Sequence, residues 1–153
     1  MIENDYVIIE VIPTTRSIKT GDIAQLSALK ISNNEIVDRF DYRLDKSKID
    51  NEYILNMIDY DNNKFKYLKT TNGILRKLKK FIGNSQLLII DNEYTKSYLS
   101  NINNNKVSFF DIFDIKTDDD SFDVLMKKYN IKPSNYLVDI MYEALIIGNK
   151  KWK

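Results

Sequence analysis

The stretch of sequence that decides the fold is residues 22–40, which read DIAQLSALKISNNEIVDRF. Residues 23–31 are rich in aliphatic side chains and predict a strand, and residues 36–44 predict a second one. Between them lies Ser32-Asn33-Asn34-Glu35, a polar segment typical of a tight turn. The two strands are therefore expected to form an antiparallel hairpin.

Before this hairpin, residues 6–12 read YVIIEVI, a nearly continuous β-branched and aliphatic run. Such a run is typical of a strand that is covered on both faces. It ends at Pro13, which cannot donate a hydrogen bond in a central ladder. A loop that ends at Gly21-Asp22 then leads into the hairpin, so we expect the chain to open with a three-stranded meander.

After residue 44 the hydrophobic period becomes helical. Residues 52–58 and 70–82 have apolar groups at helical spacing, and Gly83-Asn84 is a typical helix end. Further strands are expected at residues 86–90 and 107–112, and helices at residues 93–100, 121–129 and 135–148. A meander followed by crossovers predicts an α/β fold with a mixed five-stranded sheet flanked by helices. One domain is expected over residues 1–149, followed by a basic tail at residues 150–153.

The composition excludes many kinds of active site. The 153 residues include no His and no Cys, which excludes Ser-His-Asp triads, thiolate nucleophiles and the usual zinc sites. With 4 Gly, the chain has neither G-x-x-x-x-G-K-[ST] nor G-x-G-x-x-G. A net charge of +1 gives no global attraction to nucleic acid, although it allows a local basic face. The acidic start and the lack of a long apolar run favour a cytoplasmic protein without a membrane span.

The strands and their spacing resemble a known family. Residues 10–16 (EVIPTTR), 22–31 (DIAQLSALKI) and 34–40 (NEIVDRF) are similar to the opening of the DnaQ-like (DEDD) 3′–5′ exonucleases. Residues 81–96 (FIGNSQLLIIDNEYTK) are similar to the family's F-I-G-D-x-x-L-V-A-H-N-x-x-F-D segment, and residues 122–145 occupy the place of its H-x-x-x-x-D helices. The resemblance implies a ribonuclease H-like fold over most of the chain.

The resemblance also implies where catalytic residues would lie. In the family, four carboxylates hold two divalent ions about 3.5–4 Å apart, which activate water and stabilise the leaving oxygen. Glu10 occupies the position of the family's first aspartate, and Ile12 that of the glutamate that follows it. Lys96 occupies the position of the middle aspartate. The last aspartate falls on Ile140, or on Asp139 if the helix is shifted by one. Ile12 cannot bind an ion, and the Lys96 ammonium would repel one.

These substitutions predict a catalytically inactive relative that has no metal site and no cofactor. Lys96 would replace the missing ions by pairing with Glu10 or Asp139. We expect a module that binds single-stranded nucleic acid or a protein partner. One alternative is an active 3′–5′ exonuclease with a rearranged Mg²⁺ or Mn²⁺ site built from Glu10, Asp91 and Asp139, and another is a scaffold subunit that contacts only protein.

The nucleic-acid-binding candidates are Thr14, Thr15, Arg16 and Lys96, because the family's Thr-Thr loop approaches the terminal nucleotide. Each candidate also has a purely structural interpretation. Glu10 can be an ordinary charge at a strand end, and the acidic run Asp118-Asp119-Asp120 is typical of a loop before a helix. Tyr136 and Tyr142 lie near the family's base position, yet either can be a packing residue. The basic side of residues 70–82 is most simply a solvated helix face.

Overall fold

The computed structural model describes residues 5–14, 22–58, 65–89 and 107–109, together with Leu99, Lys127, Asn130 and Tyr142. Its strands are β1 (Asp5–Pro13), β2 (Ile23–Ser32), β3 (Glu35–Leu44), β4 (Lys66–Leu68), β5 (Gln86–Ile89) and β6 (Val107–Phe109). The described helices are the short 3-10 helix η1 (Lys46–Lys48), α1 (Glu52–Met57) and α2 (Thr71–Ile82). Apart from single residues, the helices expected at residues 93–100, 121–129 and 135–148 lie outside this description.

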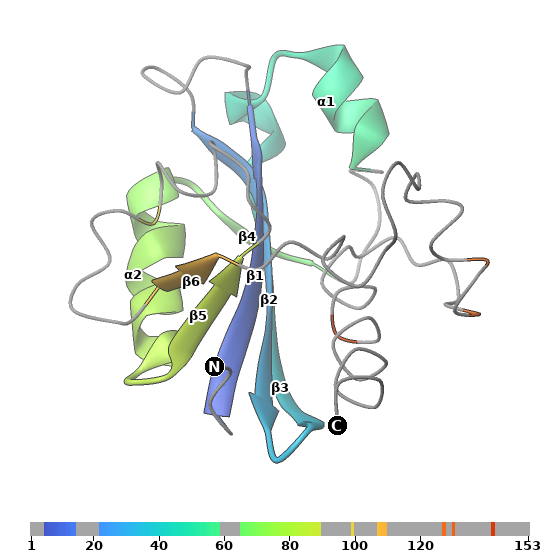
Figure 1. The fold of residues 1–153 in the computed structure, drawn as a ribbon. Coiled ribbons are helices and arrows are strands. Elements are labelled where there is room, and N and C mark those ends of the chain that lie inside the picture. Colours follow the sequence, from blue (N-terminus) through green and yellow to red (C-terminus); the bar gives the residue numbers. More distant parts are fainter. Residues whose placement is uncertain are drawn as a thin grey trace.

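The strands form one mixed sheet in the order β4-β3-β2-β1-β5-β6 (Figure 1). β2 is antiparallel to both β1 and β3, whereas β5 runs parallel to β1 and β6 parallel to β5. The predicted α/β class is confirmed, and all five expected strands are present. Sequence analysis missed β4, which pairs with residues 42–44 of β3, because three residues are too few to show a hydrophobic period.

The predicted hairpin closes through two consecutive asparagines in left-handed conformations. Asn33 has a φ of 50° and Asn34 a φ of 68°. Two positive φ angles in a two-residue loop are the mark of a type I′ turn, whose twist matches that of the flanking strands. Asparagine tolerates this conformation better than most residues, so these two residues fix the pairing next to the turn. Between Lys30 and Ile31 the register then shifts by one residue, which leaves Val37 as the extra residue of a bulge in β3.

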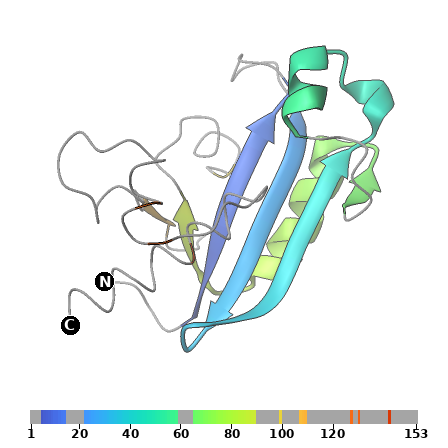
Figure 2. The ribbon, with the colours of Figure 1, turned by 90° about the vertical axis from the view of Figure 1, so that its right-hand side faces the viewer.

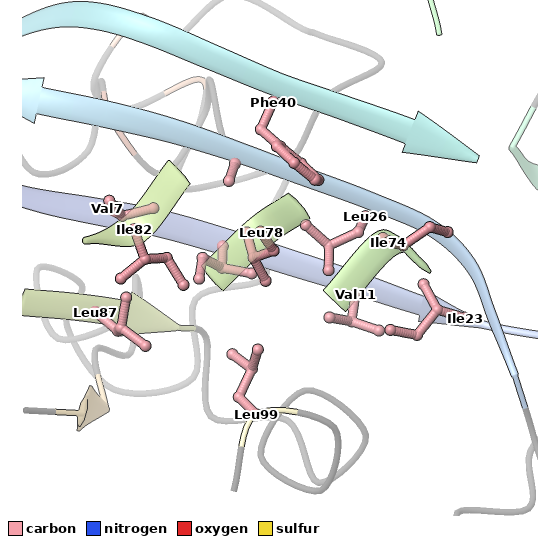
Figure 3. Close-up of a cluster of buried hydrophobic side chains, with 12 residues drawn as sticks. Val7, Val11, Ile23, Leu26, Phe40, Ile74, Leu78, Ile82, Leu87 and Leu99 are labelled. Atoms are coloured by element: carbon pink, nitrogen blue, oxygen red, sulfur yellow. The ribbon is translucent and has the colours of Figure 1, made fainter. Parts of the chain in front are cut away.

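α2 covers one face of the sheet (Figure 1). Its apolar side packs on alternate residues of the central strands, in a cluster that includes Val7, Val11, Leu26, Ile74, Leu78 and Ile82 (Figure 3). The helix begins after Thr70, whose Oγ1 accepts a hydrogen bond from the Gly73 N–H at 2.9 Å. It ends at Gly83, as predicted, where the φ is 57°. The capping residues and the apolar side thus agree with the sequence pattern.

η1 and α1 cover the opposite face, at the end of the sheet where β1 and β3 finish (Figure 2). Their apolar side chains form a second cluster made of Ala24, Leu44, Ile49, Ile54 and Ile58. The register shifts at the end of β1, where Ile12 pairs with Gln25 and Pro13 with Ile23, so that Ala24 is the extra residue of a bulge. Neither α1 nor α2, the two α-helices within the described residues, has the length and apolar character needed to cross a membrane.

Candidate functional site

Three of the sequence-predicted positions lie at the carboxyl end of β1. Glu10 and Ile12 are strand residues, and Thr14 directly follows Pro13. Because β5 runs parallel to β1, the carboxyl ends of both strands meet at the same end of the sheet. In α/β folds this end is where ligands bind. Thr15, Arg16, Asp91, Lys96, Asp139 and Ile140 lie outside the described residues.

Glu10 belongs to a polar row that crosses three neighbouring strands. It is half-buried, it lies opposite Ser27 of β2, and Ser27 in turn lies opposite Asp41 of β3. Paired residues of antiparallel strands share a face, so the three side chains leave the sheet on the same side. Ser27 Oγ and Asp41 Oδ1 are buried without a hydrogen-bond partner in the described structure. The second carboxylate oxygen of Asp41 contacts Arg39 Nε at 3.2 Å.

Ile12 lies in an apolar environment. Its half-buried side chain packs against the cluster formed by η1, α1 and the ends of β2 and β3. Ile12 occupies the position at which the resemblance places the family's second carboxylate. The described residues of the cluster are aliphatic, and the amide oxygen of Gln25, which lies opposite Ile12 on β2, already accepts a hydrogen bond from Arg43. In this chain the position therefore holds α1 against the sheet.

A buried arginine, Arg43, lies in the cross-strand row that adjoins the row of Glu10, Ser27 and Asp41. Arg43 is 2% exposed, and its Nε donates to Gln25 Oε1 at 2.8 Å. Its Nη2 donates to the carbonyl oxygen of Ile58, and its guanidinium lies 3.9 Å from the centre of the Phe65 ring. An arginine stays protonated at any ordinary pH, so this face of the sheet carries a fixed positive charge. Sequence analysis missed these residues, because only the strand register shows their neighbours. Ser27 and Asp41 share a row with Glu10, and Arg43 shares a row with Ile12.

Thr14 closes the base of the loop that follows β1. Its N–H donates to the Asp22 carbonyl at 2.8 Å, and its Oγ1 accepts from the Asp22 N–H at 3.0 Å. The Thr71 hydroxyl donates to Asp22 Oδ1 at 2.8 Å and accepts from the Ile23 N–H at 3.0 Å, which ties this base to the start of α2. Thr14 is 5% exposed, so its hydroxyl serves the fold here. Residues 15 and 16 follow Thr14 in the sequence and lie outside the described residues.

Tyr142 lies away from the Glu10 end of the sheet. Its hydroxyl donates to the Asn34 carbonyl at the β2–β3 turn. Burial, together with the nearby Tyr142 hydroxyl, raises the pKa of Tyr6 to about 12. Tyr6 and Glu10 are separated by four positions of β1, roughly 13 Å in a strand. Tyr142 therefore packs at the amino end of β1, and the prediction that it lies near a catalytic base position is wrong.

Comparison with known proteins identifies the fold. Neither protein-family models nor curated protein sequences match this chain. A solved E. coli exonuclease I in complex with a dT13 oligonucleotide matches with a TM-score of 0.62 and 11% identity, over 97% of this chain and 41% of that one. The fold is exonuclease-like. A product-bound exonuclease I matches with a TM-score of 0.62 and 10% identity, over 99% of this chain and 44% of that one.

An exonuclease I complex described as ExoI/SSB-Ct also matches, with a TM-score of 0.59 and 11% identity, over 94% of this chain and 40% of that one. This chain thus spans about two fifths of the length of these exonuclease I structures. At this level of identity the similarity establishes the fold. It confirms the ribonuclease H-like architecture that the resemblance to DnaQ-like exonucleases implied.

Proposed function

We propose that this chain is a catalytically inactive DnaQ-like domain that binds single-stranded nucleic acid without cleaving it. The observation that carries the proposal is the packing of Ile12 into the apolar cluster beneath α1. A two-metal nuclease needs carboxylate oxygens at this end of the first strand, and Mg²⁺ in particular demands a near-octahedral set of oxygens. Glu10 supplies one carboxylate, and Ile12 supplies none.

The described residues of β1 therefore do not fit a pair of divalent ions. A carboxylate in place of Ile12 would have to be taken out of water into an aliphatic cluster, which is costly unless it is paired. The expectation that this chain needs no metal or cofactor stays part of the proposal.

Nucleic-acid binding is supported by the fold and by the candidate residues at this end. A solved neighbour of the same fold holds a dT13 oligonucleotide. Thr14 anchors the loop that carries Thr15 and Arg16, and the loop starts from the end of the sheet at which ligands bind in α/β folds. Arg16 and Lys96 would contact phosphates and Thr15 the terminal nucleotide. Because the net charge is only +1, we expect modest affinity that depends on a few local cations.

A cleavage assay tests the absence of catalysis. The purified protein is incubated with a 5′-labelled single-stranded DNA or RNA in Mn²⁺, and the products are separated at single-nucleotide resolution. We expect no shortening by the wild type, and identical results for Glu10→Gln. Progressive 3′ shortening that disappears in Glu10→Gln would instead support an active exonuclease with a rearranged metal site.

A binding assay tests the second half of the proposal. Fluorescence anisotropy of labelled oligothymidylate is measured at two salt concentrations. Binding should weaken as salt rises, and Arg16→Glu should weaken it about tenfold because one phosphate contact becomes repulsive. Lys79→Glu, at an exposed lysine in the last turn of α2, is the control with the same change of charge and should have little effect. A chain that binds no nucleic acid at either salt concentration would be a protein-only scaffold.

A further inference from the structure

In the part of the chain that the structure describes, the outer edge of β3 is open along most of its length. Within the described residues, β4 pairs with this edge only at residues 42–44. Residues 35–39 are exposed, with Ile36 40% and Val37 57% accessible to solvent. Figure 2 shows β3 at the margin of the sheet, with β4 beside its carboxyl end alone. An exposed strand edge offers unpaired N–H and C=O groups to which another extended chain can add as a strand.

A basic pocket lies beside this edge, between β3 and α2. Lys66 at the start of β4 and Lys77 and Lys80 of α2 line it, together with the rings of Tyr42 and Phe81. The Lys66 Nζ lies 5.9 Å from the centre of the Tyr42 ring. Among the described residues, none of these three lysines forms an ion pair. The pocket therefore combines positive charge with half-buried aromatic surface at the place where β4 stops.

The two acidic residues in the pocket have basic neighbours. Asp38 lies opposite Lys30 across the β2–β3 ladder, and Asp41 contacts Arg39 at 3.2 Å. Four basic residues of the pocket lining, Arg39, Lys66, Lys77 and Lys80, outnumber these two carboxylates, so the pocket keeps a net positive charge. A strand laid along residues 35–41 would send alternate side chains toward α2, where these lysines lie.

The charges of the pocket select among possible occupants. A second copy of the chain paired edge to edge would bring two basic α2 faces toward each other, which is unfavourable. A nucleic acid would satisfy the lysines but would leave the main-chain edge of β3 without a matching ladder. An acidic peptide in extended conformation satisfies both features.

We propose that β3 and this pocket bind an extended acidic segment of a partner protein, which adds to the sheet as a strand beside residues 35–41. Its acidic side chains on the α2 side pair with Lys66, Lys77 and Lys80, and its main chain bonds to β3. The lysines and the strand edge of this surface are separate from the nucleic-acid candidates Thr14, Thr15, Arg16 and Lys96, so the inference stands whether or not the end of β1 binds nucleic acid.

Anisotropy of labelled peptides tests the charge requirement. The probe is a peptide of about ten residues that alternates Glu with Val, and the comparison peptide alternates Lys with Val. We expect only the acidic peptide to bind, and Lys77→Glu with Lys80→Glu to weaken it about tenfold or more. The control is the double variant Arg76→Glu with Lys79→Glu, which changes the charge of the same helix equally but at residues that do not line the pocket. This control should weaken binding of the acidic peptide less than about twofold.

Amide hydrogen exchange tests the strand addition itself. The acidic peptide should slow the exchange of amides within residues 35–41, while the amides of β1 keep their rates. The proposal is overturned if the peptide fails to bind at about 1 mM, if both double variants weaken it equally, if the amides of β3 gain no protection, or if oligothymidylate displaces the peptide. The last result would assign the pocket to nucleic acid.

Discussion

Ile12 determines what the carboxyl end of β1 can bind. A position that resembles a ligand position of nucleases is filled by an aliphatic side chain that packs under α1. In the proposed inactive domain, the obstacle to metal binding is the packing as well as the residue type, because the cluster that Ile12 contacts is aliphatic. A single substitution back to a carboxylate would therefore not restore a metal site. It would instead place a charge in an unsuitable environment.

Ile12→Glu should lower the free energy of unfolding by about 1–3 kcal/mol, because the half-buried side chain loses its packing on the aliphatic cluster and the carboxylate is partly desolvated. The loss should shrink at low pH, because burial favours the protonated carboxyl group. Val37→Glu, at a 57% exposed position of β3, is the control and should change stability by about 0.5 kcal/mol or less. Urea unfolding measures both variants. An Ile12→Glu protein as stable as the wild type would show that this position is not apolar.

Tyr6 gives the protein a distinct response to alkaline pH. Its buried hydroxyl has no hydrogen-bond partner among the described residues, and its pKa is raised from 10.0 to about 12. Between these values the unfolded chain loses a proton that the folded state keeps. The contribution of Tyr6 to stability is therefore complete below about pH 10 and is lost as the pH rises to about 12.

Tyr6→Phe should remove this part of the alkaline destabilisation. At neutral pH the variant should be at least as stable as the wild type to within about 1 kcal/mol, because an unpartnered buried hydroxyl is removed. Tyr53→Phe, whose ring is 66% exposed, is the control and should follow the wild-type pH profile. Denaturation midpoints measured from pH 8 to about 12 make the comparison. A Tyr6→Phe profile as steep as that of the wild type would contradict the assignment.

The elements that sequence analysis predicted correctly are those with a repeating pattern. β1, β2 and β3 have long aliphatic stretches, α2 has an apolar stripe, and the Asn33-Asn34 turn has residues suited to positive φ. β4 has no such pattern and depends on pairing with β3. The row of Glu10, Ser27 and Asp41 likewise exists only once the register of three strands is fixed. Pairwise register is a tertiary property, so local sequence could not reveal that row.

The end of α2 depends on the conformation of one glycine. Gly83 has a φ of 57° and a ψ of −124°, a region that residues with a Cβ rarely adopt. An alanine Cβ there would meet no heavy atom within 4 Å, so the cost is conformational. Gly83→Ala should destabilise the protein by about 1–3 kcal/mol, as measured by urea unfolding. A neutral or stabilising effect would contradict the strained geometry.

In the whole molecule, the two proposed binding surfaces lie on different strands. One is at the carboxyl end of β1 and the other is along the outer edge of β3, with β2 between them. The proposed nucleic-acid contacts Thr15, Arg16 and Lys96 are not among the pocket residues, so occupancy of one surface should leave the other accessible. The affinity for the acidic peptide should thus be unchanged within about twofold in saturating oligothymidylate, measured by anisotropy. A large mutual loss of affinity would mean that the two ligands compete for one surface.

The central claim is that the end of β1 no longer holds paired divalent ions. Anomalous diffraction from crystals of the protein with single-stranded DNA, soaked in Mn²⁺, tests this claim most directly. We predict no manganese peak beside Glu10 and Ile12, with the Ile12 side chain in contact with the α1 cluster. Two peaks about 3.5–4 Å apart at the Glu10 carboxylate would contradict the account and restore the chain to the active nucleases.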